Sequence, residues 1–190
     1  MHPSLLHLPG TPLSRAELIS ARLDGLLIEV GEGFMPPDLP ENTAARLASL
    51  GPVILPGFAA SGPSAAWVHG VGDAAPRCHH LQRFAPHRPR VRTMRDVIVH
   101  QSRLPDSDVL RIGALVVTTP VRTLTDLVLS GVRDPEALRW AQLLAARSPA
   151  LVSEVRSALE SRERIPGKRR ALALVAQLES DEQAYEEVTR

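Results

Sequence analysis

The stretch that most constrains the fold is "VVTTPVRTLTDLVLSG", residues 116–131. Its first four residues are β-branched and predict a strand, and the run after Pro120 predicts a helix that ends at Gly131. A proline in the first turn of a helix removes no hydrogen bond that the turn would make, and Thr118 or Thr119 stands where a capping residue belongs. The stretch therefore predicts a strand that passes directly into a helix, and we refer to it as the joint.

Two charged residues on the predicted helix of the joint lie four positions apart. Arg122 and Asp126 can therefore pair on one helix face, and Asp126 is too far from the helix start to be a cap. We interpret these two residues, with Thr119 and Pro120, as structural residues of the joint. The alternative is that they form a directly functional surface.

The joint also separates two kinds of sequence pattern. Predicted helices and one hairpin come first, at 13–23, 25–38 (the hairpin), 40–51 and 61–72. The first helix begins with a Ser14–Glu17 capping box. Predicted strands follow at 78–86, 97–104 and 109–119, the last of them with a turn at Gly113. After Pro120 only helices are predicted, at 120–131, 134–147, 149–164 and 167–188.

These patterns predict an α+β fold in two parts. Residues 1–38 read as a truncated winged-helix remnant, because one helix followed by a hairpin is only the back half of a winged helix. Residues 39–190 are expected to form one domain with a small mixed β-sheet near 53–119 and a C-terminal set of α-helices. Trp67 is expected to anchor the helix at 61–72 in the core of this domain rather than to lie in an interface.

The N-terminal segment has few groups that could contact DNA. Its only groove-facing candidates are Arg15 and Arg22, which are seven residues apart and so share one helix face. Residues 1–60 hold three arginines against six acidic residues. Because affinity for DNA grows with the number of neutralised phosphates, we do not expect strong DNA binding through this segment.

The middle of the chain is strongly basic, although the net charge is only +1. Residues 77–103 contain seven arginines and a single acidic residue, Asp96. Arginine pairs well with carboxylates and phosphates, so this region predicts contacts with an acidic partner or with nucleic acid. The candidate contact residues are Arg83, Arg88, Arg90, Arg92, Arg95 and Arg103. The alternative is a solvated loop in a genome that favours arginine codons.

Several chemistries find little support in the residue pattern. Five histidines and Cys78 lie within 32 residues, but their spacing matches no zinc motif, and His79 and His80 would point to opposite faces of a strand. A metal-dependent nuclease needs clustered carboxylates, for which the candidates are Asp96, Asp106, Asp108 and Asp126. The sequence has no nucleophile elbow and no phosphate-binding glycine loop. We therefore expect no catalytic residue, no metal and no cofactor.

Cysteine content and hydropathy bear on the compartment. The single cysteine, Cys78, cannot form an internal disulfide, which fits a reducing cytoplasm. No run reaches 18 apolar residues, and the start of the chain lacks the features of a signal peptide. We therefore expect a cytoplasmic protein without a membrane span.

Three segments in order point to a family: "SGPSAAWVHGVGD" from Ser61, "CHHLQRF" from Cys78 and "VIVHQSRLPDSDVLRIGALVVTTPVRTLTDL" from Val97. Their order and spacing resemble the signature region of AbiEi-type antitoxins of type IV toxin–antitoxin systems, an abortive infection family. The resemblance covers residues 13–131 and is strongest over 61–127. Its helix motif includes Trp67 and His69, and its strand-to-helix motif includes Thr119, Pro120, Arg122 and Asp126.

The resemblance implies a protein that binds rather than catalyses. In this family an N-terminal winged helix binds the operon's own promoter, and the C-terminal domain counters a nucleotidyltransferase toxin (AbiEii-like) encoded beside it. We therefore expect a non-catalytic antitoxin. Promoter repression and a homodimer stay open, because the winged helix is abbreviated. The alternatives are an orphan DNA-binding transcriptional regulator without a toxin partner, and a metal-dependent nuclease.

Overall fold

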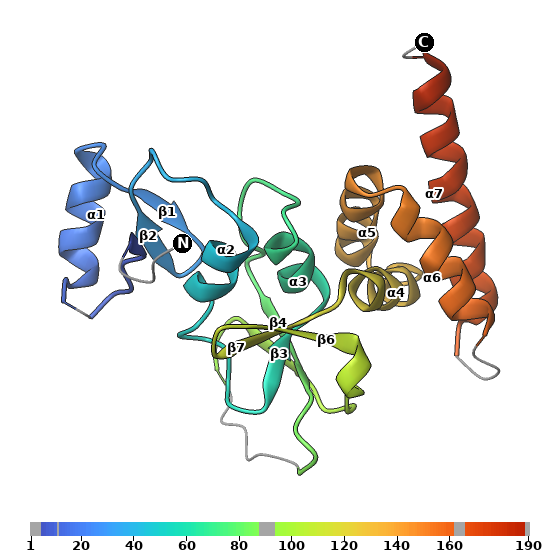
Figure 1. Cartoon of the computed structure of the whole chain (residues 1–190), viewed down its shortest axis with the longest axis horizontal. Coiled ribbons are helices and arrows are strands. Elements are labelled where there is room, and N and C mark those ends of the chain that lie inside the picture. The colour runs from blue at the N-terminus through green and yellow to red at the C-terminus, as the bar shows by residue number, and fades with distance from the viewer. Residues whose placement is uncertain (1–4, 11, 88–93, 162–165, 189–190) are drawn as a thin grey trace.

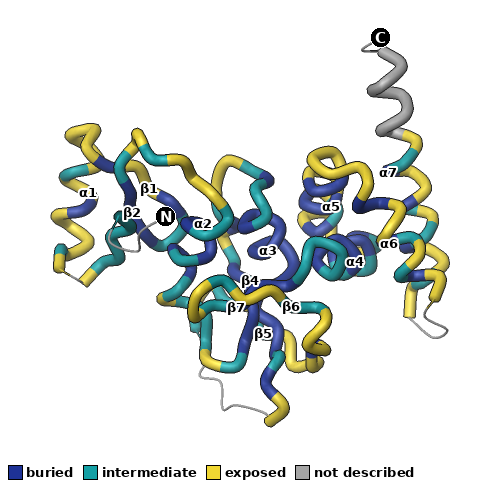
Figure 2. The backbone as a smooth tube through the Cα atoms, in the orientation of Figure 1, coloured by how far each residue is buried: buried dark blue, intermediate teal, exposed yellow. Residues whose placement is uncertain are grey.

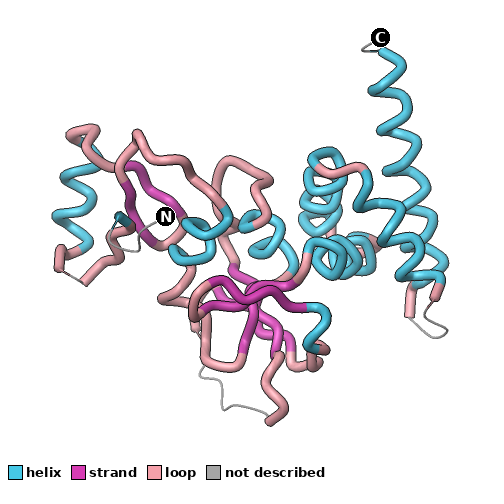
Figure 3. Tube along the Cα trace, in the orientation of Figure 1, coloured by secondary structure: helices cyan, strands magenta, loops and turns pink. Residues whose placement is uncertain are grey.

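The computed structural model describes residues 5–10, 12–87, 94–161 and 166–188, with side chains described up to residue 180. These residues form seven α-helices and seven strands, and the strands make one five-stranded mixed sheet and one two-stranded sheet. The predicted α+β class is confirmed. The strands lie toward the N-terminal side and the middle of the molecule, while helices alone make up the C-terminal side (Figure 3).

The N-terminal part consists of a helix and a hairpin, as predicted: α1 (Arg15–Leu23), β1 (Ile28–Val30) and β2 (Gly33–Met35). The predicted capping box is present, because Ser14 N–H donates to the Glu17 carboxylate at 2.8 Å and Ser14 Oγ accepts from Glu17 N–H at 3.3 Å. Helix and hairpin enclose a small core of their own, made of Leu18, Leu27 and Phe34. The division of the chain at residue 38 stays a prediction.

The hairpin turn packs closely against two other helices at Gly31. This residue has a φ of +56°, and a Cβ placed on it would lie 2.3 Å from Ser49 Oγ and 3.0 Å from the Trp67 ring. Ser49 belongs to α2 (Thr43–Ser49) and Trp67 to α3 (Gly62–Val68). Glycine therefore allows the hairpin to approach both helices more closely than any other residue would.

Trp67 lies at the centre of this contact and is 1% exposed, which confirms its expected role as a core anchor. The buried Arg46 guanidinium of α2 lies over the Trp67 ring, 5.0 Å from its centroid, and donates to the Trp67 carbonyl at 2.7 Å. Glu41 pairs with the same guanidinium at 2.5 Å. These partners are needed, because a buried charge without them would be costly.

The five-stranded sheet has the order β5-β4-β3-β7-β6. Its strands are β3 (Phe58–Ala60), β4 (His79–Arg83), β5 (Val97–His100), β6 (Val109–Ile112) and β7 (Leu115–Thr118). β3 pairs antiparallel with β4 and parallel with β7, and β4 pairs parallel with β5. The predicted segment 109–119 forms β6 and β7, which turn at Gly113 as expected. The pattern does not single out β3, because a three-residue apolar run has no measurable period.

The chain after the joint is helical, as predicted: α4 (Pro120–Gly131), α5 (Pro135–Arg147), α6 (Ala150–Glu160) and α7 (Lys168–Val188). α4 lies between the sheet and the other three helices (Figure 1). Its inner residues Leu124, Leu127 and Val128 are fully buried and join the main core, and α3 and α4 are among the most buried helices (Figure 2). No helix of the described residues is both long and apolar enough to cross a membrane.

Candidate functional site

The joint between β7 and α4 is held by hydrogen bonds on both sides of Pro120. Thr119 is the N-cap of α4, and its hydroxyl accepts from Arg122 N–H at 3.2 Å, so the predicted capping position is confirmed. The hydroxyls of Thr118 and Thr123 share a hydrogen bond of 2.7 Å. His69, directly after α3, donates from Nε2 to the Thr118 carbonyl at 2.8 Å. The end of one strand is thereby fixed to two helices at once.

Arg122 connects the joint to a segment that sequence reasoning did not relate to it. Its Nε donates to Asp126 at 2.7 Å, which confirms the predicted pair. Its Nη1 donates to Asp108 at 2.6 Å, from the short 3-10 turn η2 (Asp106–Asp108) that precedes β6. Burial opposes the Arg122 charge, but the two carboxylates outweigh it and raise the Arg122 pKa. Burial also raises the pKa of Asp126, and Arg122 offsets part of that rise.

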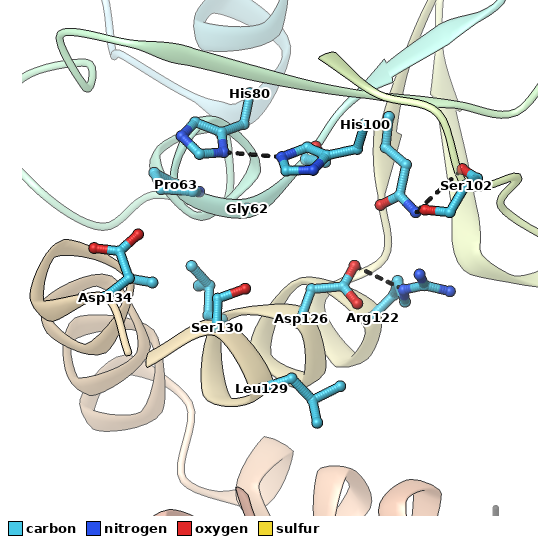
Figure 4. Close-up of a pocket in the computed structure, with 14 residues that line it drawn as sticks. Gly62, Pro63, His80, His100, Ser102, Arg122, Asp126, Leu129, Ser130 and Asp134 are labelled. Carbon is cyan, nitrogen blue, oxygen red and sulfur yellow. Dashed lines mark hydrogen bonds and ion pairs between the residues drawn. The ribbon is translucent and has the colours of Figure 1, made fainter. Parts of the chain in front are cut away.

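A cleft of about 260 Å³ opens beside the joint. One wall is one face of β4 with the end of β5 and the start of α3, and it presents His80, Gln82, His100 and Ser61. The opposite wall is one side of α4 and the start of α5, and it presents Arg122, Asp126, Ser130 and Asp134 (Figure 4). We call this space the joint cleft.

Two histidines from neighbouring strands form the most distinctive feature of the joint cleft. The rings of His80 and His100 stack with their centroids 5.4 Å apart and an interplanar angle of 29°, and His80 Nδ1 lies 3.2 Å from His100 Nε2. Burial, followed by the neighbouring His100, lowers the pKa of His80 to about 4. Burial also lowers the pKa of His100. Both rings are therefore neutral at pH 7.

Ser61 contributes a polar group that the protein leaves unused. The residue is 2% exposed, and its Oγ has no hydrogen-bond partner among the described residues. Its N–H donates to the His80 carbonyl at 2.9 Å, and the register of β3 and β4 places it opposite His80, on the same face of the sheet. Ser61 therefore lies on the histidine side of the joint cleft, with its hydroxyl buried there. By contrast, the Gln82 amide is occupied, because it donates to Ser102 Oγ at 2.9 Å.

The predicted basic surface is only partly assembled by the described residues. Arg83 is 8% exposed and donates to the carbonyls of Ala85 at 2.7 Å and Gln101 at 3.1 Å, so its guanidinium serves the interior rather than a surface. Arg95 and Arg103 are exposed, and Arg103 donates to the Phe84 carbonyl at 3.4 Å. The remaining candidates lie outside the described residues: Arg88, Arg90 and Arg92.

The two arginines proposed to face a DNA groove lie on α1. Arg15 pairs with Glu29 of β1 at 3.6 Å, with both side chains about half exposed. Arg22 is exposed in the last turn of the helix. The ion pair lowers the positive charge that this surface presents to a phosphate backbone.

Ser64, His79 and Glu32 have the residue types and the order of a catalytic triad. The Ser64 hydroxyl lies 3.5 Å from His79 Nδ1, and His79 Nε2 lies 3.2 Å from the Glu32 carboxylate. Ser64 is fully buried, however, and its oxygen already accepts from His80 N–H at 2.9 Å. The hydroxyl cannot meet a substrate, so the three residues act as a tie between the hairpin, β4 and α3. His79 and His80 point to opposite faces of β4, as predicted.

Of the carboxylates considered for a nuclease, Asp108 and Asp126 lie together, but an arginine rather than a metal ion joins them. Asp108 pairs with Arg122, and Asp96 has a φ of +61° and accepts from His79 N–H through its backbone carbonyl at 2.7 Å. Within the described ranges, no three His, Cys, Asp or Glu side chains come close enough to hold a metal ion. Sequence reasoning missed the pairing of Asp108 and the grouping of Ser61, His80, His100 and Asp134. The one available signal was strand alternation, which places His80 and Gln82 on one face.

No protein-family model matches the chain, and a search of curated proteins finds no significant match.

Proposed function

We propose that this chain is a non-catalytic antitoxin of a type IV toxin–antitoxin system, which acts in the bacterial cytoplasm by binding a nucleotidyltransferase toxin. The observation that carries the proposal is the use of the signature residues inside the fold. Trp67 fills the core, His69 ties α3 to the end of β7, and Thr119 caps α4. The residues that resemble the antitoxin family therefore serve to hold the fold together, and the resemblance supports a shared fold.

The same observation favours binding over catalysis. Arg122 and Asp126, the charged pair of the signature, are held together with Asp108 in one ion-pair cluster, so neither is poised as an acid, a base or a nucleophile. The Ser64 hydroxyl beside His79 is sealed in the interior. Neither signature group is placed to react with a substrate, and this favours a protein that works by association.

The two exposed candidates, Arg95 before and Arg103 after the edge strand β5, are the described residues that would contact the partner in this proposal. An acidic patch of a toxin is the surface that they fit. Promoter binding has a minor part, because Glu29 already pairs with Arg15 in the N-terminal remnant. An orphan regulator would have to bind DNA with little more than Arg22 from this helix.

The test is a pull-down of the tagged chain from its native cells at moderate salt, with co-purifying proteins identified by mass spectrometry. We expect a nucleotidyltransferase in stoichiometric amount. We expect the double variant Arg95→Glu, Arg103→Glu to retain at least about 10-fold less of the nucleotidyltransferase. The new carboxylates would repel an acidic patch of the toxin, because like charges across an interface repel. The matched control is Arg139→Glu on α5, also exposed, which should retain the partner.

Two results would count against the proposal. Retention of DNA alone, with binding that falls steeply with salt, would identify an orphan regulator. Divalent-metal-dependent cleavage of nucleic acid that Asp106→Ala abolishes would identify a nuclease.

A further inference from the structure

We propose that the joint cleft is a binding site for a guanidinium group, carried either by a small guanidino compound or by an arginine side chain of another protein. This inference does not depend on the antitoxin proposal, because it rests only on the charge, the shape and the hydrogen-bonding groups of the joint cleft. His80, His100, Ser61 and Asp134 converge there from four different segments of the chain.

The charge of the joint cleft selects a cation. Its ionised lining residues are Arg122, Asp126 and Asp134. The Arg122 charge is already neutralised by Asp126 and by Asp108 behind it. The two imidazoles carry no charge at pH 7, since burial lowers the pKa of each. The Asp134 carboxylate is thus left as excess negative charge, which repels a phosphate and attracts a cation.

The shape of the joint cleft favours a flat cation. The stacked rings of His80 and His100 make one wall, while Asp126, Ser130 and Asp134 lie along the other (Figure 4). A guanidinium is planar and stacks on ring faces, whereas an ammonium is a compact and strongly hydrated charge. The volume of about 260 Å³ holds such a group together with an alkyl stem.

The hydrogen-bonding groups of the cleft match a group that only donates. Guanidinium has five N–H donors and no acceptor. Asp126 gives one carboxylate oxygen to Arg122, and Asp134 gives one to the Glu136 N–H that it caps, so each retains acceptor capacity. Ser61 Oγ, buried on the histidine side of the cleft and without a protein partner in the described chain, is a further acceptor beside this site. A metal ion is the poorer fit, because no three ligating side chains come together among the described residues.

The full chain is titrated with agmatine at pH 7. Binding is monitored through the chemical shifts of the His80 and His100 ring protons in NMR spectra. We expect saturable shifts of both histidines. The key variant is Asp134→Asn, because asparagine keeps the helix cap and removes only the charge. It should weaken agmatine binding by about 10-fold and leave the melting temperature unchanged, as expected for the loss of one charge-assisted hydrogen bond.

Three comparisons decide the assignment. The control Asp106→Asn, on the exposed η2 turn, should bind agmatine like the unaltered chain. Putrescine, which has an ammonium in place of the guanidinium, should bind at least several-fold more weakly; equal affinity would overturn the choice of guanidinium. No saturable shift, or equal binding by Asp134→Asn, would overturn the site itself.

The two sources of the guanidinium are told apart with N-acetyl-arginine methylamide. If it binds as well as agmatine, the cleft accepts an arginine side chain within a polypeptide, and the ligand is a protein. If agmatine alone binds, the cleft excludes a flanking backbone, and the ligand is a free guanidino compound. Either result supports recognition of the guanidinium, and neither requires the toxin partner.

Discussion

Replacing Gly31 by alanine should be among the most damaging single-methyl changes in this protein. Three costs add up at this position. The φ of +56° costs a Cβ-bearing residue about 1 kcal/mol. The new methyl would lie 2.3 Å from Ser49 Oγ, which must turn away and give up its buried 2.8 Å hydrogen bond to the Arg46 carbonyl, worth about 1 kcal/mol. The 3.0 Å contact with the immobile Trp67 ring adds about 1 kcal/mol of crowding.

The expected loss is therefore about 3 kcal/mol in the free energy of unfolding, or about 6–12 °C in melting temperature for a chain of this size. Urea unfolding followed by tryptophan fluorescence measures it. Gly113→Ala is the matched control, because Gly113 has a similar φ of +61° but nothing within 4 Å of the added Cβ. It should lose only about 1 kcal/mol. Equal losses in the two variants would show that the hairpin does not pack against α2 and α3 as described.

Further predictions concern the joint and its cleft. Arg122→Ala should lower the free energy of unfolding by about 2–4 kcal/mol, because it leaves the Asp108 and Asp126 carboxylates partly buried without their cation; urea midpoints measure this, and a loss below about 1 kcal/mol would refute it. Folding depresses the pKa of His80 from 6.5 to about 4, so the stability that the neutral ring contributes should be present above pH 6.5 and fall between pH 6.5 and about 4; His80→Gln should flatten this dependence. Ser61→Ala should be neutral or stabilise by up to about 1 kcal/mol, since the hydroxyl has no protein partner to lose, and a clear loss of stability would mean that it has one.

Local signals were sufficient for most helices and for the joint. A capping residue lies within four positions of the helix that it starts, and Ser14 and Thr119 both cap the helices expected of them. The pair of Arg122 and Asp126 is equally local, because its spacing is fixed by the helix itself.

Contacts between distant segments could not be predicted in the same way. The pairing of Arg122 with Asp108 depends on β6 lying beside β7, which no local pattern encodes. The meeting of His80 and His100 depends on β4 and β5 running parallel with Gln82 opposite His100. Strand register is a property of the whole sheet, so the joint cleft emerges only in three dimensions.

Arg83 differs from these distant contacts, because the sequence pattern around it did indicate that its side chain is buried. Alternate residues of a strand share a face, so Arg83 lies on the same side as Leu81 and His79. All three are buried. Charge alone suggested a surface contact, whereas strand alternation places this guanidinium inside, where backbone carbonyls hold it.

The direct passage from β7 into α4 has a mechanical consequence for the protein. One residue, Thr119, separates the strand from the helix, and His69 and Thr123 anchor the strand's last residue to α3 and α4. One wall of the joint cleft is made by α3 with β4 and β5, which belong to the same sheet as β7, and the other by α4 with the start of α5. A linkage as short as Thr119 leaves no room for a hinge between the sheet and α4. The two walls are therefore fixed relative to each other. The cleft binds its ligand in a preformed shape, so no binding free energy is spent on closing it.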